Sequence, residues 1–477
     1  MSAVVVVGDV VLDRDVIGDA TRLCPDGPAP VVDQVDEVVR TGGAGLTASL
    51  VRQTSPTTAV HLVTAFAADA AGGIARGWLE DRGVSLTDLV DHGSTTEKIR
   101  VRVDDRTLLR VDRGVAGHIG EPSDGLDRLR CEGSLQHADV VLVSDYGRGM
   151  TAHPAVRAML AGVIDRGVPV VWDPHPRGAA PVAGSTVVLP NTSEAGLLGD
   201  RPADLGEATR RAVALRDEWR VGAVALTMGA GGALLVSGDG VPLVVPVDGP
   251  GERGDTCGAG DAFAAGVALA LADDALLSHA VTHGVAVAGG YLRAGGATGR
   301  GTGTGTGGVS DDDLRDDGLR DDGTGAPSGA PRARLVAAGG CFDILHAGHI
   351  AMLRHARRLG DRLVVLLNSD ASVRRLKGPG RPVQRDVDRA AVIGSLSFVD
   401  DVIVFDEDTP ADALERLRPD VFVKGGDYTH RHVHEQATVE RWGGTVVSVP
   451  FVDGLSTTRL LASARGSDPE GIHAHAR

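Results

Sequence analysis

The chain has 477 residues, of which 42% are hydrophobic, and a formal net charge of −16 at pH 7. This length predicts two or three domains, each large enough to bury its own core. The negative charge argues against nucleic acid and anionic membranes as partners. Four separated cysteines without a CxxC pair predict reduced thiols in a cytoplasmic protein, and no apolar run is long enough to span a membrane.

The first part of the chain, residues 1–298, alternates strand-like and helical runs. The strands are expected at residues 3–7, 59–63, 139–143, 168–172, 186–189 and 223–227. This alternation predicts an α/β fold with a doubly wound, mainly parallel sheet, whose ligands bind at the carboxyl ends of the strands. Because the part contains no GxxxxGK[ST] motif, a P-loop kinase is excluded.

A glycine-rich segment, Gly258-Ala259-Gly260-Asp261, opens an apolar helix at residues 262–272. Backbone N–H groups at such a helix start form an anion hole for a phosphoryl group in transfer. The Asp261 carboxylate can take the proton of an attacking hydroxyl group. Considered alone, the same position equally suits a helix cap.

Neighbouring motifs resemble those of the ribokinase-like family of sugar kinases. The segment at 255–261 reads DTCGAGD, and it occurs with NTSE at 191–194, TMG at 227–229 and GDVVLD at 8–13. The resemblance covers nearly the whole first part and implies a small lid over the sheet and the use of ATP and Mg²⁺. It implies that the sugar is bound by Asp13, Gly42, Gly43, Lys98 and Arg100. It places Asn191 and Glu194 near magnesium and the phosphates, and Thr227 and Gly229 near the nucleotide. It also implies that Asp261 is the base and that the anion hole is formed by Gly258, Ala259 and Gly260.

Two positions depart from the pattern of these kinases. Leu46 ends the glycine motif at Gly42 where the family has an asparagine that contacts the sugar, and His175 stands where a lysine is usual. Leucine cannot hydrogen-bond a hydroxyl group. One alternative is therefore a kinase part that has lost activity and serves in dimerisation or sugar binding.

A low-complexity stretch separates this part from the rest of the chain. Residues 299–332 pass through Gly-Thr alternation, an Asp-rich run and a Gly/Ala/Pro segment, which predicts a flexible linker. A second domain is expected at 333–465, followed by a disordered tail at 466–477.

The second domain begins with a short apolar run and two histidines. Residues 335–338 predict a strand and residues 348–360 a helix, so that His346 and His349 face the same side of the turn between them. A helix start attracts an anion, so we expect a phosphate site here. Cys341 with the two histidines could instead bind zinc, but no fourth ligand lies nearby, so phosphate is favoured.

Four motifs of this domain together resemble the nucleotidyltransferases that join a nucleoside monophosphate to a phosphorylated small molecule. They are HAGH at 346–349, RLKG at 375–378, VKGGDY at 423–428 and STTR at 456–459. The resemblance implies a Rossmann-like α/β domain. It implies that His346, His349, Lys377, Lys424, Ser456, Thr457 and Thr458 stabilise the α-phosphate, and that Cys341, Phe342, Gly425 and Asp427 line the nucleotide site.

The fusion of the two parts resembles the family of bifunctional heptose kinase–adenylyltransferases. This resemblance implies ATP-dependent phosphorylation of a heptose 7-phosphate at C1. After a separate phosphatase acts, the second part would make ADP-heptose and pyrophosphate. The implied partners are sugar phosphates, nucleotide and a second copy in a homodimer. A further alternative is a cytidylyltransferase acting on a polyol phosphate, since HxGH does not read the base.

Overall fold

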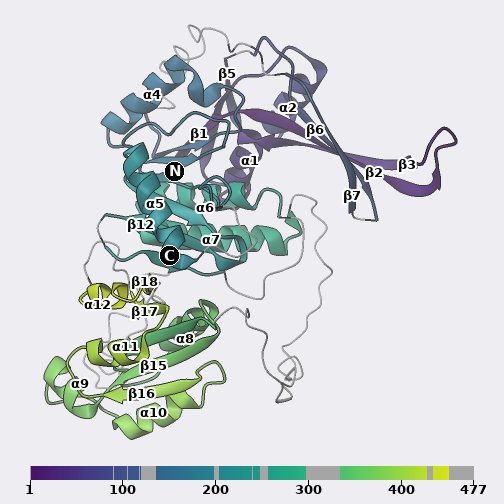
Figure 1. Ribbon diagram of the computed structural model, residues 1–477. Helices are drawn as coiled ribbons and strands as arrows, with labels where there is room; N and C mark the ends of the chain where they lie inside the picture. The colour runs from purple at the N-terminus through teal and green to yellow at the C-terminus, as the bar shows by residue number, and fades with distance from the viewer. Residues whose placement is uncertain are drawn as a thin grey trace. The chain divides into compact units, whose positions relative to one another are not determined.

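The computed structural model divides into two compact units, Met1–Leu292 and Arg293–Arg477 (Figure 1). It describes residues 2–89, 91–104, 106–115, 117, 119, 136–197, 204–238, 240–247, 256–296, 333–426 and 433–450. The predicted linker and tail lie outside the described residues, as do Asp427 and Ser456, Thr457 and Thr458.

The first unit is built on a mainly parallel sheet with the strand order β13-β12-β11-β10-β9-β8-β1-β4-β5. Its strands are β1 (Ala3–Gly8), β4 (Ala59–Thr64), β5 (Ser85–Asp88), β8 (Val140–Ser144), β9 (Val170–Asp173), β10 (Val187–Val188), β11 (Ala223–Thr227), β12 (Ala233–Ser237) and β13 (Leu243–Val245). The central strands are valine-rich and buried along their length, as strands covered on both faces must be. All six predicted strands are confirmed. The structure adds three more to this sheet: β5, which pairs in parallel with β4, and β12 and β13, which pair antiparallel.

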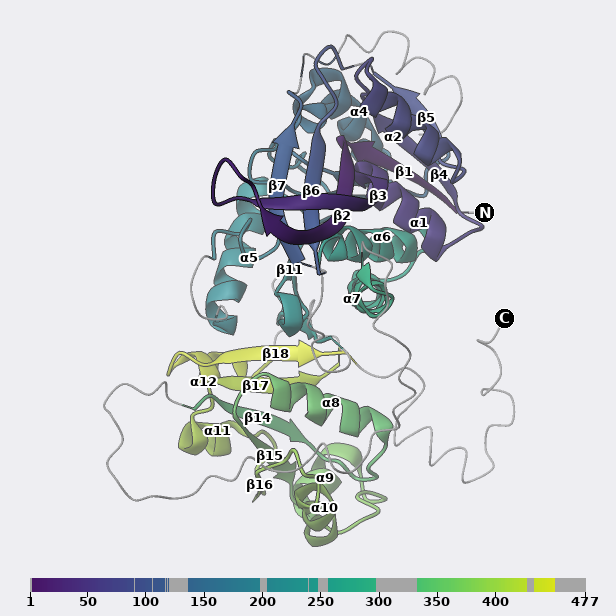
Figure 2. The ribbon, with the colours of Figure 1, turned by 90° about the vertical axis from the view of Figure 1, so that its right-hand side faces the viewer.

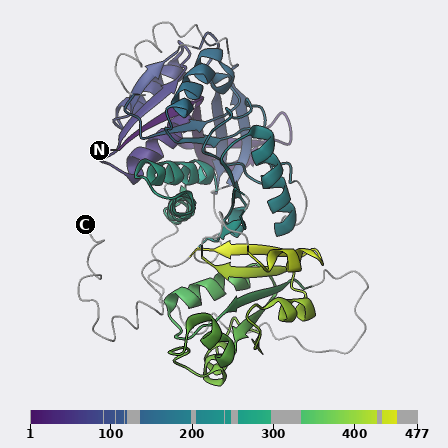
Figure 3. The ribbon, with the colours of Figure 1, turned by 90° about the vertical axis from the view of Figure 1, so that its left-hand side faces the viewer.

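Helices cover both faces of this sheet. They are α1 (Ala44–Thr54), α2 (Ala70–Glu80), α4 (Pro154–Asp165), α5 (Leu205–Trp219), α6 (Ala259–Ala272) and α7 (Leu277–Arg293), with short 3₁₀ turns η1 (Met150–Ala152) and η2 (Gly229–Gly231). Figures 2 and 3 show α6 and α7 on one side of the central strands and α5 on the other. Helix α6 packs against α1, β8 and β9, so its first turn lies at the carboxyl ends of those strands.

A second, four-stranded sheet projects from the first unit with the order β3-β2-β6-β7 (Figure 1). Its strands are β2 (Val10–Leu23), β3 (Pro30–Gly43), β6 (Glu97–Val103) and β7 (Arg106–Arg113). This sheet is the small lid that the resemblance implied. Because β2 follows directly on β1, Asp13 lies where the lid meets the central sheet.

The second unit has a parallel sheet with the order β16-β15-β14-β17-β18. Its elements are β14 (Leu335–Gly340), α8 (Ala347–Arg358), β15 (Arg362–Asn368), α9 (Asp370–Lys377), α10 (Asp386–Gly394), β16 (Asp401–Phe405), α11 (Ala411–Leu417), β17 (Val421–Gly425), α12 (Gln436–Glu440) and β18 (Thr445–Val449). The predicted strand and helix around the two histidines are confirmed as β14 and α8. The strand order reverses at β14, which is where open α/β sheets bind ligands.

Among the described residues, no helix is long and apolar enough to cross a bilayer.

Candidate active sites

The carboxylate of Asp261 lies in a buried polar centre of the first unit. Asp261 is in the first turn of α6, and only 5% of the residue is exposed. It accepts a hydrogen bond from Thr47 Oγ1 at 2.6 Å and from the Tyr146 hydroxyl at 2.9 and 3.0 Å. The N-cap residue of α6 is Gly258, so the alternative that Asp261 is a helix cap is wrong.

This environment tunes the acidity of Asp261. Burial raises the pKa of Asp261 to about 6, against the opposing effects of hydrogen bonds from Thr47 and Tyr146 and the charge of Lys98. The carboxylate is therefore mostly ionised at pH 7, yet it binds a proton more strongly than an ordinary aspartate. Such a group suits general-base catalysis near neutral pH.

Three strands of the lid bring the expected sugar-binding residues together. Arg100 Nη1 lies 2.7 Å from Asp13 Oδ1, and both side chains are mostly buried. Lys98 Nζ lies 5.0 Å from the centre of the Tyr146 ring, and burial lowers the pKa of Lys98. A side chain at Gly42 would collide with Asp13, and Gly43 has a φ of 63° that favours glycine.

Arg100 and a second arginine of the same strand, Arg102, both turn inward. Arg100 and Arg102 of β6 face the buried carboxylates of the neighbouring strand β2, with Arg102 Nη1 3.8 Å from Asp15 Oδ2. Both arginines are therefore paired with carboxylates of the lid.

The glycine-rich segment forms the start of α6. Gly258 has a φ of 84°, and a side chain there would collide with the hydroxyl of Tyr291, which donates to the Cys257 carbonyl at 3.0 Å. Leu46 lies beside the same glycine. Ala259 and Gly260 follow in the first turn of α6 beside Asp261, and the Ala259 N–H donates to the Thr256 carbonyl at 3.1 Å.

The residues expected near magnesium and the nucleotide lie at the carboxyl ends of β10 and β11. The Asn191 N–H donates to Glu194 Oε2 at 2.8 Å, and the Glu194 N–H donates to Asn191 Oδ1 at 2.9 Å. Asn191 also forms a β-bridge with Thr227, after which Gly229 begins η2 with a φ of 57°. Carboxylate and amide oxygens are ligands that Mg²⁺ prefers, so this pair fits the ion.

The two histidines of the second unit stack on each other. His346 caps α8 and His349 lies in its first turn, with 3.8 Å between ring centres and an angle of 23° between ring planes. The Phe342 ring contacts His349 edge-on at 5.1 Å. The prediction that both imidazoles face the same side is confirmed.

Both imidazoles have lowered pKa values in the free protein. Burial lowers the pKa of His346. Burial, together with the charges of His346 and Lys377, lowers the pKa of His349 to about 4. Lys377 is the last residue of α9.

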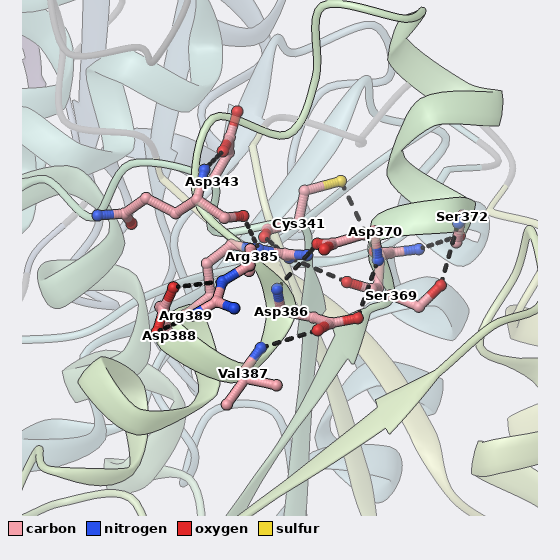
Figure 4. Close-up of polar contacts among 12 residues, drawn as sticks. Cys341, Asp343, Ser369, Asp370, Ser372, Arg385, Asp386, Val387, Asp388 and Arg389 are labelled. Atoms are coloured by element: carbon pink, nitrogen blue, oxygen red, sulfur yellow. Dashed lines mark hydrogen bonds and ion pairs between the residues drawn. The ribbon is translucent and has the colours of Figure 1, made fainter.

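A buried arginine, Arg389, fixes the loop that leads to the histidines (Figure 4). Its side chain is fully buried, and Nη2 lies 2.8 Å from Asp370 Oδ1. It also donates to the carbonyl oxygens of Cys341 at 2.6 Å, Asn368 at 2.9 Å and Gln384 at 3.0 Å. The ends of β14 and β15 are thus tied to α10, a role that the sequence analysis missed. The one available signal was that Arg389 shares the buried helix face of Ile393.

A second buried ion pair holds the other side of this loop. Asp343 lies 2.6 Å from Arg381 Nη1 and accepts from the N–H groups of Val383 and Gln384. Burial acts to raise the pKa of Asp343, but these donors outweigh it and lower the pKa. Asp343 and Arg381 were also missed.

Lys424, near the end of β17, is held by an acidic partner. Its Nζ lies 3.0 and 2.9 Å from the two carboxylate oxygens of the buried Glu435. Gly425 ends the same strand and pairs with Val449. The sequence analysis did not foresee Glu435.

The zinc alternative finds no ligand set among the described residues. There, no group of three or more His, Cys, Asp or Glu side chains is placed to hold a metal ion. The thiol of Cys341 instead contacts Asn368 Oδ1 at 3.7 Å.

Replacing Arg389 with methionine is expected to destabilise the second unit by about 3 to 5 kcal/mol, because Asp370 and three carbonyl groups lose their buried donor. Hydrogen exchange of the β14 and β15 amides in the full chain measures this change. The matched control is Arg385→Met on the same helix start, where the ion pair with Asp388 is exposed. Equal exchange rates in the two variants would contradict the role given to Arg389.

Comparison with known proteins identifies both units. The model of the pfkB family of carbohydrate kinases matches residues 1–300, and the cytidylyltransferase-like model matches residues 337–462. A Streptomyces coelicolor protein named bifunctional protein HldE is 46% identical over 474 residues, 96% of each chain. The protein of that name from Caulobacter vibrioides is 36% identical over 487 residues, again 96% of each chain. This chain, a pfkB-family carbohydrate kinase unit followed by a cytidylyltransferase-like unit, therefore belongs to the family of the bifunctional HldE proteins.

Proposed function

We propose that the chain catalyses two reactions of sugar-nucleotide synthesis. The first unit transfers a phosphoryl group from ATP to C1 of a heptose 7-phosphate. The second unit makes ADP-heptose and pyrophosphate from ATP and a heptose 1-phosphate. The observation that carries this proposal is the contrast between the sites: the first has the buried carboxylate of Asp261 with two hydroxyl donors, and the second has the stacked imidazoles of His346 and His349 at the start of α8.

In the kinase reaction, the C1 hydroxyl oxygen attacks the γ-phosphorus of ATP and its proton passes to Asp261. The bond from the γ-phosphorus to the bridging oxygen breaks, and ADP leaves. The start of helix α6, at Gly258, Ala259 and Gly260, is proposed to stabilise the charge on the transferred group. Asp13, Lys98 and Arg100 hold the sugar phosphate, and Thr227 and Gly229 lie at the nucleotide. Mg²⁺ held by Asn191 and Glu194 would neutralise charge on the ATP phosphates.

In the adenylyl transfer, a phosphate oxygen of the sugar attacks the α-phosphorus of ATP and pyrophosphate leaves. This oxygen is already ionised, so no base is required. Three carboxylates of this unit, Asp343, Asp370 and Glu435, each pair with a cation, which is consistent with a site that works without a base. His346, His349, Lys377 and Lys424 stabilise the negative charge. The hydroxyls of residues 456–458 are proposed to join them, and Cys341, Phe342, Gly425 and Asp427 to line the nucleotide.

The hydrogen bonds that Asp261 accepts from Thr47 and Tyr146 support an active kinase over the alternative of a binding module. Leu46 removes one polar contact, yet the base, its two hydroxyl donors and the glycine-rich helix start are all in place.

Binding of a triphosphate in the second unit is expected to take up a proton. His349 carries no proton charge at pH 7 because its pKa is lowered to about 4, and a nearby phosphate raises that pKa. Affinity should therefore increase as the pH falls from the neutral range towards the free-protein pKa of about 4. Calorimetry with a non-hydrolysable ATP analogue, in buffers of different ionisation enthalpy, measures the uptake. Since the first unit also binds nucleotide, the difference between wild type and His349→Ala is the quantity of interest, and equal uptake in both would contradict the assignment.

We also propose that the protein acts in the cytoplasm as a homodimer. The lid sheet supports the dimer, because Val35, Leu108 and Leu109 are apolar and 71%, 49% and 56% exposed. Light scattering of the purified chain tests the state of assembly.

The full-length chain with magnesium tests the proposed reactions. We expect ADP release from ATP with heptose 7-phosphate, and pyrophosphate release from ATP with heptose 1-phosphate. Pyrophosphate from CTP alone would instead favour cytidylyl transfer to a polyol phosphate. Absence of ADP release would favour the binding-module alternative.

A further inference from the structure

Four buried hydroxyl and carboxyl groups form a chain of hydrogen bonds across the first unit. Ser144 Oγ lies 3.1 Å from Thr47 Oγ1, which lies 2.6 Å from Asp261 Oδ1. Thr47 has a single proton, and the short distance assigns it to Asp261. Ser144 therefore donates to Thr47. Ser144 and Thr47 are both fully buried, so water does not compete for these bonds.

The Tyr146 hydroxyl approaches the same carboxylate from the other side. It lies 3.0 Å from Oδ1 and 2.9 Å from Oδ2 of Asp261. Burial, with the negative charges of Asp261 and Asp173, raises the pKa of Tyr146 well above its ordinary value. The phenol thus keeps its proton and remains a donor throughout the neutral range.

The position of Tyr146 is fixed at both its ring and its backbone. The ring stacks on His175 at 6.2 Å between centres, and Lys98 Nζ lies 5.0 Å from its centre. The backbone N–H groups of Tyr146, Arg148 and Met150 all donate to the carboxylate of Asp9, which is 4% exposed. One buried carboxylate therefore anchors the segment that presents the phenol to Asp261.

We propose that Tyr146 and Thr47 are positioning residues of the kinase, which hold the Asp261 carboxylate in one orientation and keep it ionised at neutral pH. This proposal rests on the proposed role of Asp261 as the base. Neither hydroxyl takes part in the proton transfer itself, which runs from the sugar hydroxyl to Asp261.

The charges around Asp261 explain why two neutral donors matter. Lys98 of β6 favours the ionised carboxylate, whereas Asp13 of β2 and Asp173 at the end of β9 oppose it. Burial, the largest effect, also opposes ionisation and raises the pKa of Asp261. The hydrogen bonds from Thr47 and Tyr146 offset part of this effect and so bring the carboxylate into the working range.

The test is the pH dependence of kcat/KM for ADP formation by full-length Tyr146→Phe. Removing the phenol takes away a donor to a charged group, so the acidic limb should move to higher pH by about one unit. Activity should fall most below pH 7 and recover towards pH 9. The sugar phosphate titrates in the same range, but its contribution is common to all variants.

Matched variants separate positioning from a general effect on the fold. Thr47→Val should move the limb in the same direction, and Thr47→Ser, which keeps the hydroxyl, should restore it. Tyr291→Phe removes the other described tyrosine hydroxyl, which donates to the Cys257 carbonyl, so its limb should stay at the wild-type pH. If Tyr146→Phe does not fold, the comparison of Thr47→Val with Thr47→Ser tests the positioning role by itself.

Two failures are distinguishable. If Asp261→Asn abolishes ADP formation while the limb stays in place in both Tyr146→Phe and Thr47→Val, the positioning role is wrong and the kinase assignment stands. If Asp261→Asn retains wild-type ADP formation, Asp261 is not the base and both proposals are overturned.

Discussion

Asp261→Asn should lower ADP formation by about 10²- to 10⁴-fold. Asparagine keeps the size of the side chain and still accepts from Thr47 and Tyr146, so the centre should remain packed. It cannot take the proton of the attacking hydroxyl. Pyrophosphate formation by the same preparation should be unchanged, because the second unit uses none of these groups.

Asp273→Asn is the matched control for this variant. Asp273 lies at the opposite end of α6 and is exposed, so its loss removes the same charge from the same helix without touching the site. Both activities should survive there. Retention of more than a tenth of the ADP formation in Asp261→Asn would mean that another group accepts the proton.

His349→Ala should lower pyrophosphate formation by about 10²- to 10³-fold, because an imidazole donor to the developing charge on the α-phosphate is lost. The ring contacts to His346 and Phe342 are also removed. ADP formation from heptose 7-phosphate should not change. Both products are measured in the same preparation.

His355→Ala, in the last turn of the same helix, is the control for a general effect on α8. It should leave pyrophosphate formation near the wild-type rate. If His349→Ala and His355→Ala behave alike, the loss reports on the helix and not on a phosphate site.

The backbone of both sites was predictable because it depends on local patterns. Apolar runs located the parallel strands, and the glycines before Asp261 and His349 marked the helix starts at their carboxyl ends. The helix start Gly258 and the stacked pair of His346 and His349 are therefore found where the sequence placed them.

The side-chain partners were not predictable, since they join positions far apart in the chain. Thr47 and Asp261 are 214 residues apart, and Arg389 and Cys341 are 48 apart. No periodicity relates such positions. Thr47 directly follows the glycine motif, where the sequence analysis considered only the asparagine that Leu46 replaces. The hydroxyl of Thr47 donates to Asp261.

The ion-pair partners of charged residues were equally unpredictable from the sequence. Lys424 was predicted to bind a phosphate. No regular sequence pattern connects it to its partner Glu435, so this ion pair could not be predicted. Asp343 lies shortly before the HAGH motif, yet its burial against Arg381 appears only in the folded structure.

The central claim is that one chain carries two separate chemical sites, and mixing two inactive variants tests it most directly. Asp261→Asn and His349→Ala are each incubated with heptose 7-phosphate, ATP, magnesium and a phosphatase that removes the 7-phosphate only from the heptose 1,7-bisphosphate, first alone and then together. Neither variant alone should make ADP-heptose, and the mixture should make it at a rate within a few fold of wild type. A mixture as inactive as its components would contradict the claim.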